Sequence, residues 1–335
     1  MASTLPTQSE PTWERLNRRA SLAAGIAGMM AATLHARPRP IQLAEESVTE
    51  QAQATTDSSI RLGFGTYGMR SLAPLDAIRV TSAIGYQGIE LCLLKGWPTS
   101  LAEMSLGNRQ DLRKALADQH LDVPSLLESL PCLRGEATHQ SNLDRLKASA
   151  EFGKELAQST PPVVQSIVGG KAEDWENSKH QLVTELGDWA EIGREMGVVI
   201  CFKPHASHLV GLPEQALWIL DQINSPSLRI VYDYSHYFLE GIDLKESLKR
   251  LLPVTPYIQV KDSAGTRAKH RYLLPGDGET NYKLYFQELH RLNYQGFVNV
   301  EVSSMIHRLE GYDPLATAKL CYQRLQPLLQ EVISR

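Results

Sequence analysis

Four short apolar segments of the chain each end abruptly in side chains that carry charge or exchange protons. They are 198–205 (VVICFKPH), 229–236 (RIVYDYSH), 257–262 (YIQVKD) and 297–302 (FVNVEV). Apolar, β-branched runs of this length are typical of strands that are buried on both faces. Because α/β proteins place their chemistry where parallel strands end, we expect one site to hold Lys203, His205, Asp233, His236, Gln259, Lys261, Asp262 and Glu301.

The alternation of residues along these strands predicts which side chains point inward. A polar residue between apolar neighbours on a strand faces the opposite side from them. Gln259 and Glu301 each stand between two aliphatic residues, and Lys203 directly follows Phe202. We therefore expect the apolar neighbours to face helices, while these three side chains and Asp233 face the axis of the sheet.

Strand and helix patterns alternate about eight times along the chain, which favours a closed (β/α)8 TIM barrel over an open doubly wound sheet. The GxGxxG spacing at 63–68 begins within the first predicted strand and none follows that strand, so the fingerprint of a dinucleotide-binding fold is missing from its usual place. We place the barrel at 61–335. Besides the four segments above, we predict strands at 62–67, 88–93, 123–128 and 162–168, and helices at 74–84, 108–119, 143–156, 175–196, 213–223, 244–252, 282–292 and 315–333.

The N-terminal part of the chain has the pattern of an export signal. The pair Arg18 and Arg19 precedes a run of apolar and small residues to about Leu34, which is too short for a membrane span. We predict a signal peptide over 1–36 and a periplasmic location, with the paired arginines favouring the twin-arginine route. The alternative is a disordered basic tail. Residues 37–60 are predicted to be a disordered linker.

Composition excludes some classes of protein. The chain has 335 residues, 42% of them hydrophobic, and its 34 basic and 38 acidic residues give a net charge of −4. A nucleic-acid-binding surface normally shows an excess of basic residues, so we expect no nucleic-acid partner. The four cysteines are far apart and lack the spacing of metal ligands.

The motifs at the strand ends resemble those of the xylose isomerase-like TIM barrels. This family contains sugar and sugar-phosphate isomerases and epimerases, with hydroxypyruvate isomerases and inosose dehydratases among them. The resemblance covers roughly residue 61 to the C-terminus and implies a small carbohydrate or polyol substrate. It also admits a homodimer, because barrels of this family often pair. The motifs are GYQGIE (85–90), KPH (203–205), DYSH (233–236), VKD (260–262), RYLLPGDG (271–278) and GFVNVE (296–301).

In that family a divalent metal is typically held by Glu, Asp, His and Glu side chains from strands five to eight. At these positions the chain has Lys203, Asp233, Gln259 and Glu301. A protonated lysine has no lone pair to give, and a glutamine carbonyl is a weak ligand compared with imidazole. The resemblance therefore implies either no cofactor or a divalent metal held weakly by an incomplete set, Asp233, Gln259 and Glu301.

The charges suggest what replaces the metal. Asp233 and Glu301 carry two negative charges and Lys203 carries one positive charge, which leaves the same single negative charge as the family ligands with their cation. We hypothesise that the Lys203 ammonium takes the electrostatic role of the metal. By resemblance, Glu301 is the catalytic base and Lys203 stabilises the enediolate oxygen or donates a proton. Substrate contacts are expected from His205, His236, Arg271 in a loop, and Glu128.

The sequence leaves three functions open. The preferred one is an isomerase or epimerase that abstracts a proton beside a carbonyl group. A lyase or dehydratase would begin with the same step, and a carbohydrate-binding barrel without activity would keep Lys203 and Glu301 as a structural ion pair. An endonuclease of the same superfamily is disfavoured, because its metal site needs more His and Glu ligands than these strand ends supply.

Overall fold

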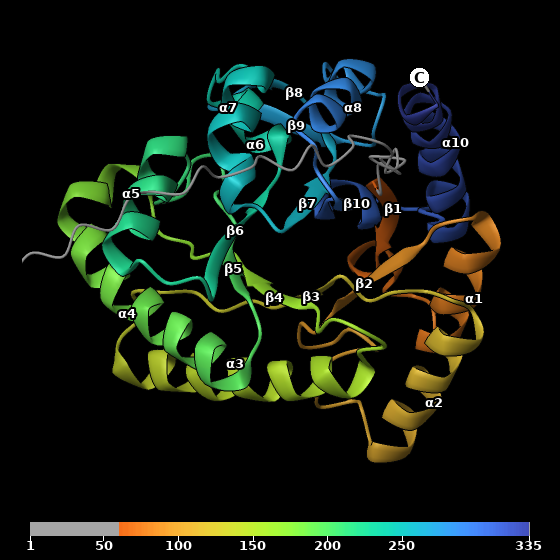
Figure 1. Ribbon diagram of the computed structural model, residues 1–335, viewed down its shortest axis with the longest axis horizontal. Helices are drawn as coiled ribbons and strands as arrows, with labels where there is room; N and C mark the ends of the chain where they lie inside the picture. Colours follow the sequence, from red (N-terminus) through yellow and green to blue (C-terminus); the bar gives the residue numbers. More distant parts are fainter. Residues whose placement is uncertain (1–59, 335) are drawn as a thin grey trace, which may run out of the picture. The chain divides into compact units, whose positions relative to one another are not determined.

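Eight parallel strands close into a barrel in the computed structural model, which describes residues 60–334. The order around the barrel is β1-β10-β7-β6-β5-β4-β3-β2, and Figure 1 shows the strands surrounded by helices. The predicted (β/α)8 TIM barrel is confirmed. The strands are β1 (Ile60–Gly65), β2 (Gly88–Cys92), β3 (Ser125–Leu127), β4 (Val163–Ser166), β5 (Ile200–Phe202), β6 (Leu228–Tyr232), β7 (Tyr257–Val260) and β10 (Gly296–Val300).

Most helices that cover the barrel begin and end within two residues of the prediction, but α3 begins at Glu136 and not at 143, and the short helices α6 and α9 were not predicted. Proline begins α1, and glycine with positive φ follows both α1 (Gly85) and α4 (Gly197), as expected of helix ends. The bounds of α1, α4 and α5 coincide with the prediction. The helices are α1 (Pro74–Ile84), α2 (Leu106–Asp118), α3 (Glu136–Leu156), α4 (Trp175–Met196), α5 (Pro213–Ile223), α6 (Tyr234–Leu239), α7 (Leu244–Leu251), α8 (Tyr282–Arg291), α9 (Ser304–His307) and α10 (Pro314–Ile333).

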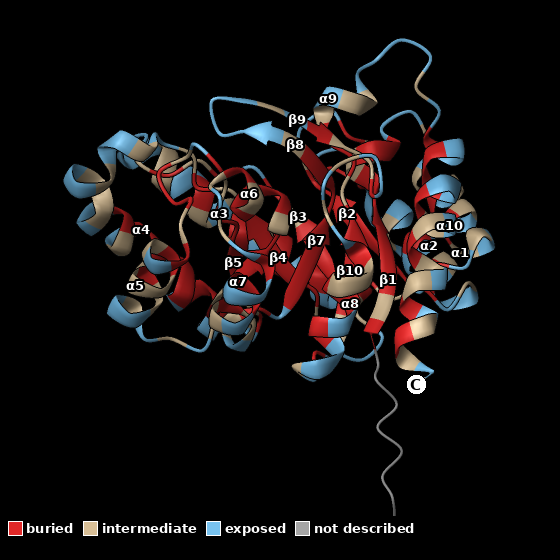
Figure 2. Cartoon of the chain, turned by 90° about the horizontal axis from the view of Figure 1, so that it is seen from above, coloured by how far each residue is buried: buried red, intermediate tan, exposed pale blue. Residues whose placement is uncertain are grey.

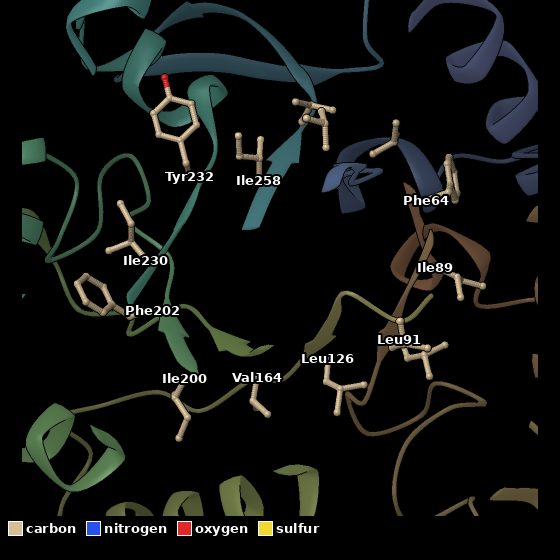
Figure 3. Packing of buried hydrophobic residues seen from close by; sticks show 14 of the residues in the cluster. Phe64, Ile89, Leu91, Leu126, Val164, Ile200, Phe202, Ile230, Tyr232 and Ile258 are labelled. Carbon is tan, nitrogen blue, oxygen red and sulfur yellow. The ribbon is translucent and has the colours of Figure 1, made fainter. Parts of the chain in front are cut away.

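Alternation along the strands separates two cores. Phe202, Tyr232 and Ile258 belong to the large hydrophobic cluster shared with the helices, and Figure 3 shows them on their strands. Their neighbours along the strands form a second, small cluster on the inner face: Val163, Cys201, Val231, Tyr257 and Phe297. Lys203, Asp233 and Gln259 each come two residues after a member of this inner cluster, and Glu301 comes four residues after Phe297, so these side chains also face the barrel axis.

An antiparallel hairpin that the sequence analysis did not predict follows β7. It consists of β8 (Asp262–Thr266) and β9 (Lys269–Leu273). In Figure 2 the hairpin and α9 project from the same end of the barrel. The segment after β9 closes on Asp262, whose carboxylate accepts hydrogen bonds from the backbone N–H groups of Gly276 (3.0 Å), Gly278 (3.0 Å) and Thr280 (3.1 Å).

Glycine is needed at position 278 of this segment. A Cβ atom there would lie 2.5 Å from Asp262 Oδ1 and 2.5 Å from the carbonyl oxygen of Ser263. The PGDG part of the predicted RYLLPGDG motif therefore has a structural role, because it holds the carboxylate that orders the hairpin.

Several predictions concern residues outside those described. The signal peptide at 1–36 lies there, as does the linker at 37–60 apart from Ile60, which is the first residue of β1. Among residues 60–334, no helix combines the length and the apolar composition that a membrane crossing needs. The four cysteines are free and buried.

Candidate active site

The ammonium group of Lys203 lies among three oxygen atoms at the C-terminal ends of the strands. Its Nζ atom donates to Gln259 Oε1 at 2.6 Å, lies 2.8 Å from Asp233 Oδ2 and pairs with Glu301 Oε2. The Lys203 side chain is only 4% exposed. The structure thus brings together the four residues that the resemblance placed at metal-ligand positions, with the lysine nitrogen at the point where the other three converge.

A second ammonium group, that of Lys261, faces the same two carboxylates. Its Nζ atom pairs with Asp233 Oδ2 and lies 3.1 Å from Glu301 Oε2. The charge balance expected from the sequence was wrong, because it counted Lys203 alone. Two buried cations oppose two buried anions, and this group of four side chains is neutral. The signal was present in the sequence, since Lys261 comes two residues after Gln259 and must share its face of the strand.

Asp233 has two tasks, one for each carboxylate oxygen. Oδ2 faces the two lysines, whereas Oδ1 accepts hydrogen bonds from the backbone N–H (3.1 Å) and the hydroxyl (2.7 Å) of Ser235. The second pair of contacts caps the N-terminus of α6. Oδ1 is therefore the cap of this helix, and the cap fixes the direction in which Oδ2 points.

The ion pairs outweigh the cost of burial. Burial raises the pKa of Asp233, but Lys203 and Lys261 hold that pKa below its ordinary value, and the pKa of Glu301 is lowered in the same way. Burial works to lower the pKa of Lys261, but Asp233 and Glu301 hold it above its ordinary value. Both carboxylates and the Lys261 ammonium therefore stay charged at neutral pH.

One layer deeper in the barrel lies Glu90 of β2, which is fully buried. Its carboxylate accepts hydrogen bonds from Tyr257 Oη (2.9 Å), Gln259 Nε2 (2.9 Å) and Gln165 Nε2 (2.5 Å). Burial, with a smaller contribution from Glu301, raises its pKa to about 7. Gln259 thus connects this carboxyl to Lys203, because its amide N–H₂ binds Glu90 and its carbonyl oxygen binds the ammonium.

His236, expected to contact substrate, lies instead behind Lys261. It is fully buried, with Nε2 3.1 Å from Lys261 Nζ and Nδ1 2.9 Å from the hydroxyl of Tyr272. Burial lowers its pKa well below the ordinary value, so the ring is neutral. Sequence reasoning missed Tyr272 because the hairpin that carries it was not recognised.

A cavity of about 400 Å³ opens onto the charged group. Its lining includes Lys203, Lys261 and Glu301 together with Glu128, His205, His270, Tyr272 and Tyr67.

Arg271 was predicted to lie in a loop and contact substrate. It lies in β9 between His270 and Tyr272 instead, and it is exposed and absent from the lining because successive strand residues face opposite sides. A larger hollow of about 650 Å³ lies elsewhere, beside α1 and α2.

Of the other predicted substrate contacts, Glu128 is already paired, whereas His205 has a ring nitrogen available. Glu128 is 2% exposed, and its carboxylate already pairs with Arg145 and accepts from Ser149 Oγ at 2.8 Å. His205 has Nδ1 3.0 Å from the carbonyl oxygen of Ala206. Burial lowers the pKa of His205 to about 3, so its ring is neutral and keeps Nε2 for a ligand.

The donor set does not fit a divalent metal. Within residues 60–334, no three His, Cys, Asp or Glu side chains are placed to hold one. The point where Asp233, Gln259 and Glu301 direct their oxygen atoms is taken by an ammonium group, which is a donor and cannot be a ligand. A second ammonium lies beside it, so a metal would meet two positive charges at this position.

Comparisons with known proteins agree with the fold. The model of the family described as xylose isomerase-like TIM barrel matches residues 78–319. A Danio rerio protein that bears the name hydroxypyruvate isomerase is 32% identical over 89 residues, which cover 27% of this chain and 30% of that protein. An inosose dehydratase of Mesomycoplasma hyopneumoniae (strain 7448) is 25% identical over 173 residues, 47% of this chain and 55% of its own. The matches thus span about half or less of these relatives.

A solved structure has a related fold with a metal. The IOLI protein, described with a binding zinc atom, has a TM-score of 0.68 and 20% identity, over 82% of this chain and the whole of that one. At this identity the likeness concerns the fold alone. The likeness therefore says nothing about the side chains around Lys203, whose arrangement is known only from the structure of this chain.

Proposed function

Because the chain belongs to the xylose isomerase-like TIM barrel family, we propose that it is an enzyme that abstracts a proton beside the carbonyl group of a small keto-sugar or related polyol derivative. The observation that carries the proposal is a carboxylate, Glu301, that lines the cavity beside two ammonium groups. Proton abstraction from carbon needs a base, and the enediolate oxygen that results needs positive charge nearby. Glu301 supplies the first, and Lys203 and Lys261 supply the second.

The hydrogen bonds of the lysines indicate how substrate binding activates the base. An ammonium group has three N–H donors, and Lys203 uses its three on Gln259, Asp233 and Glu301. Lys261 uses its own on Asp233, Glu301 and His236. A substrate oxygen must therefore replace one of these partners.

Glu301 is the partner that a substrate can replace. Its side chain is 14% exposed, whereas that of Asp233 is completely buried and fixed by the α6 cap. When a carbonyl or hydroxyl oxygen takes the lysine N–H groups, Glu301 loses the ion pairs that keep its pKa low. Its affinity for a proton then rises at the moment when the substrate carbon is adjacent.

We assign the electrostatic role of the family's metal to the two ammonium groups. They are held in place by buried partners and directed at one point, which is the arrangement that stabilises developing negative charge. Isomerase or epimerase chemistry is the first candidate. A lyase is the second, since inosose dehydratase stands among the relatives and elimination begins with the same proton abstraction.

Solvent deuterium exchange into a panel of keto-sugars tests the proposal. We expect exchange beside the carbonyl, its loss in Glu301→Gln, and its retention in the exposed control Glu310→Gln. Exchange with an isomer as product supports the isomerase, and exchange with an elimination product supports the lyase. Sugar binding without any exchange would show a binding protein, and exchange that survives in Glu301→Gln would remove Glu301 from the role of base.

A further inference from the structure

Three buried side chains beside the cavity form a row. Lys261 Nζ lies 3.1 Å from His236 Nε2, and His236 Nδ1 lies 2.9 Å from the hydroxyl oxygen of Tyr272. The three residues are 3%, 0% and 7% exposed, and Tyr272 belongs to the lining of the cavity. The functions assigned above to Lys261 do not account for this row, since the enediolate needs only its positive charge.

The chemistry of the groups fixes the direction of the hydrogen bonds. An ammonium group can only donate, so His236 Nε2 accepts from Lys261 and the imidazole proton is on Nδ1. The contact of 3.5 Å between Nε2 and Asp233 Oδ2 is longer, and that oxygen already receives both lysines. Nδ1–H then donates to the Tyr272 oxygen, and the hydroxyl hydrogen of Tyr272 has no acceptor among residues 60–334.

We propose that Tyr272 is the acid that protonates a substrate oxygen, and that His236 and Lys261 return its proton. This inference rests on the function proposed above. The O–H bond of Tyr272 breaks as its proton passes to a lone pair of the carbonyl oxygen or of the departing hydroxyl group. The phenol oxygen takes the Nδ1 proton of His236, and Nε2 takes a proton from Lys261, which becomes a neutral amine.

Glu301 can return a proton to Lys261, which completes a cycle of proton transfers. Glu301 holds the proton removed from the substrate carbon, and its Oε2 atom lies 3.1 Å from Lys261 Nζ. When the product leaves and Glu301 regains this contact, transfer of that proton to the amine restores both the ammonium and the carboxylate. One proton leaves carbon and one reaches oxygen, with no net gain or loss by the protein, so water is not required as a proton source.

The variant Tyr272→Phe tests this assignment, with Tyr285→Phe as its control. Tyr285 is fully buried and its hydroxyl lacks a partner among the described residues, so the control removes a tyrosine oxygen elsewhere in the core. We expect Tyr272→Phe to lower product formation about 100-fold or more, the usual range for a general acid, while carbon–deuterium exchange falls much less. The control should behave as the wild type.

Nitrogen-15 NMR of the histidines gives a second readout that needs no substrate. His236 should be the Nδ1–H tautomer, and Tyr272→Phe should shift its Nδ1 resonance more than its Nε2 resonance. An Nε2–H tautomer, an imidazolium, or wild-type turnover in Tyr272→Phe overturns the relay while the proposed function stands. A wild type that exchanges no keto-sugar proton overturns the proposed function, and the relay as a catalytic device with it.

Discussion

The ammonium nitrogen of Lys203 lies 2.8 Å from Asp233 Oδ2, and the same oxygen pairs with Lys261. One carboxylate oxygen therefore holds two cations, and Glu301 completes a square of alternating charge. Removal of any one member leaves the other three with one charge that is not balanced. The square is a structural unit as well as a candidate catalytic one.

Lys203→Met should destabilise the protein strongly. The substitution keeps the length of the side chain but leaves two buried carboxylates to share one ammonium, which typically costs about 3–5 kcal/mol. The free energy of unfolding in urea at neutral pH measures the effect. Lys283→Met is the control, because Lys283 pairs with Glu331 at the surface and its side chain is 44% exposed. Equal stability of the two variants would contradict the burial of the charged square.

The purified protein should contain no stoichiometric divalent metal, because an ammonium occupies the point where a metal would bind. The double variant Lys203→Glu/Gln259→His restores the ligand types of the related barrels, and we expect it to bind zinc or manganese. Elemental analysis and isothermal titration calorimetry measure both proteins. A wild type that carries one metal per chain would refute the role assigned to the lysine, and activity insensitive to chelators would agree with it.

Glu90 should make the stability depend on pH. Its pKa is raised from the ordinary value of 4.5 to about 7, so the folded state resists its ionisation. Between these values the unfolded chain ionises first, and the contribution of Glu90 to the free energy of unfolding falls by about 3 kcal/mol as the pH rises. Below the lower value and above the higher one this contribution is constant.

Glu90→Gln removes this contribution. The stability of the variant relative to the wild type should therefore increase from about pH 5 to about pH 8, as measured by urea unfolding at both values. Taking the difference cancels the opposing effect of the buried histidines, which both proteins share. Glu310→Gln on the surface should give a flat difference. A flat difference for Glu90→Gln as well would show that this carboxyl ionises freely in the folded protein.

Asp262→Asn should loosen the β8–β9 hairpin. The asparagine keeps one acceptor oxygen but presents an N–H₂ group to backbone N–H groups that now bind a carboxylate, and we expect a loss of at least about 2 kcal/mol. Hydrogen exchange at 262–273 should accelerate. Asp277→Asn, in the same segment but paired with Arg324 at the surface, should leave exchange unchanged. Slow exchange in both variants would mean that other contacts order the hairpin.

The sequence predicted the barrel because its signals are local and repeated. Alternation about Gln259 and Glu301 places them on the inner face, and glycine marks the ends of α1 and α4 where predicted. The convergence of Lys203, Asp233 and Glu301 follows from the rule that parallel strands end together. These features depend on neighbours a few residues apart, which is the range that periodicity reports.

The rest of the site depends on contacts between distant segments. Lys261 reaches Asp233 across 28 residues, and nothing in the local pattern states that both lysines meet the same oxygen. The hairpin escaped notice because its first strand, DSAGT, has the composition of a loop, and its second strand, KHRYL, is short. Arg271 was consequently assigned to the cavity in place of Tyr272, the next residue on the opposite face.

The hairpin brings His270 and Tyr272 to the cavity on a strand that is not part of the barrel wall, while its tip, residues 265–269, is exposed. Asp262 is the first residue of the hairpin, and its carboxylate also holds the segment that follows the hairpin. Insertions, deletions or replacements in this one continuous stretch of chain can thus change which molecules the cavity accepts, without disturbing the eight strands beneath. A chimaera in which only residues 263–275 are exchanged between two relatives should also exchange their ligand preference.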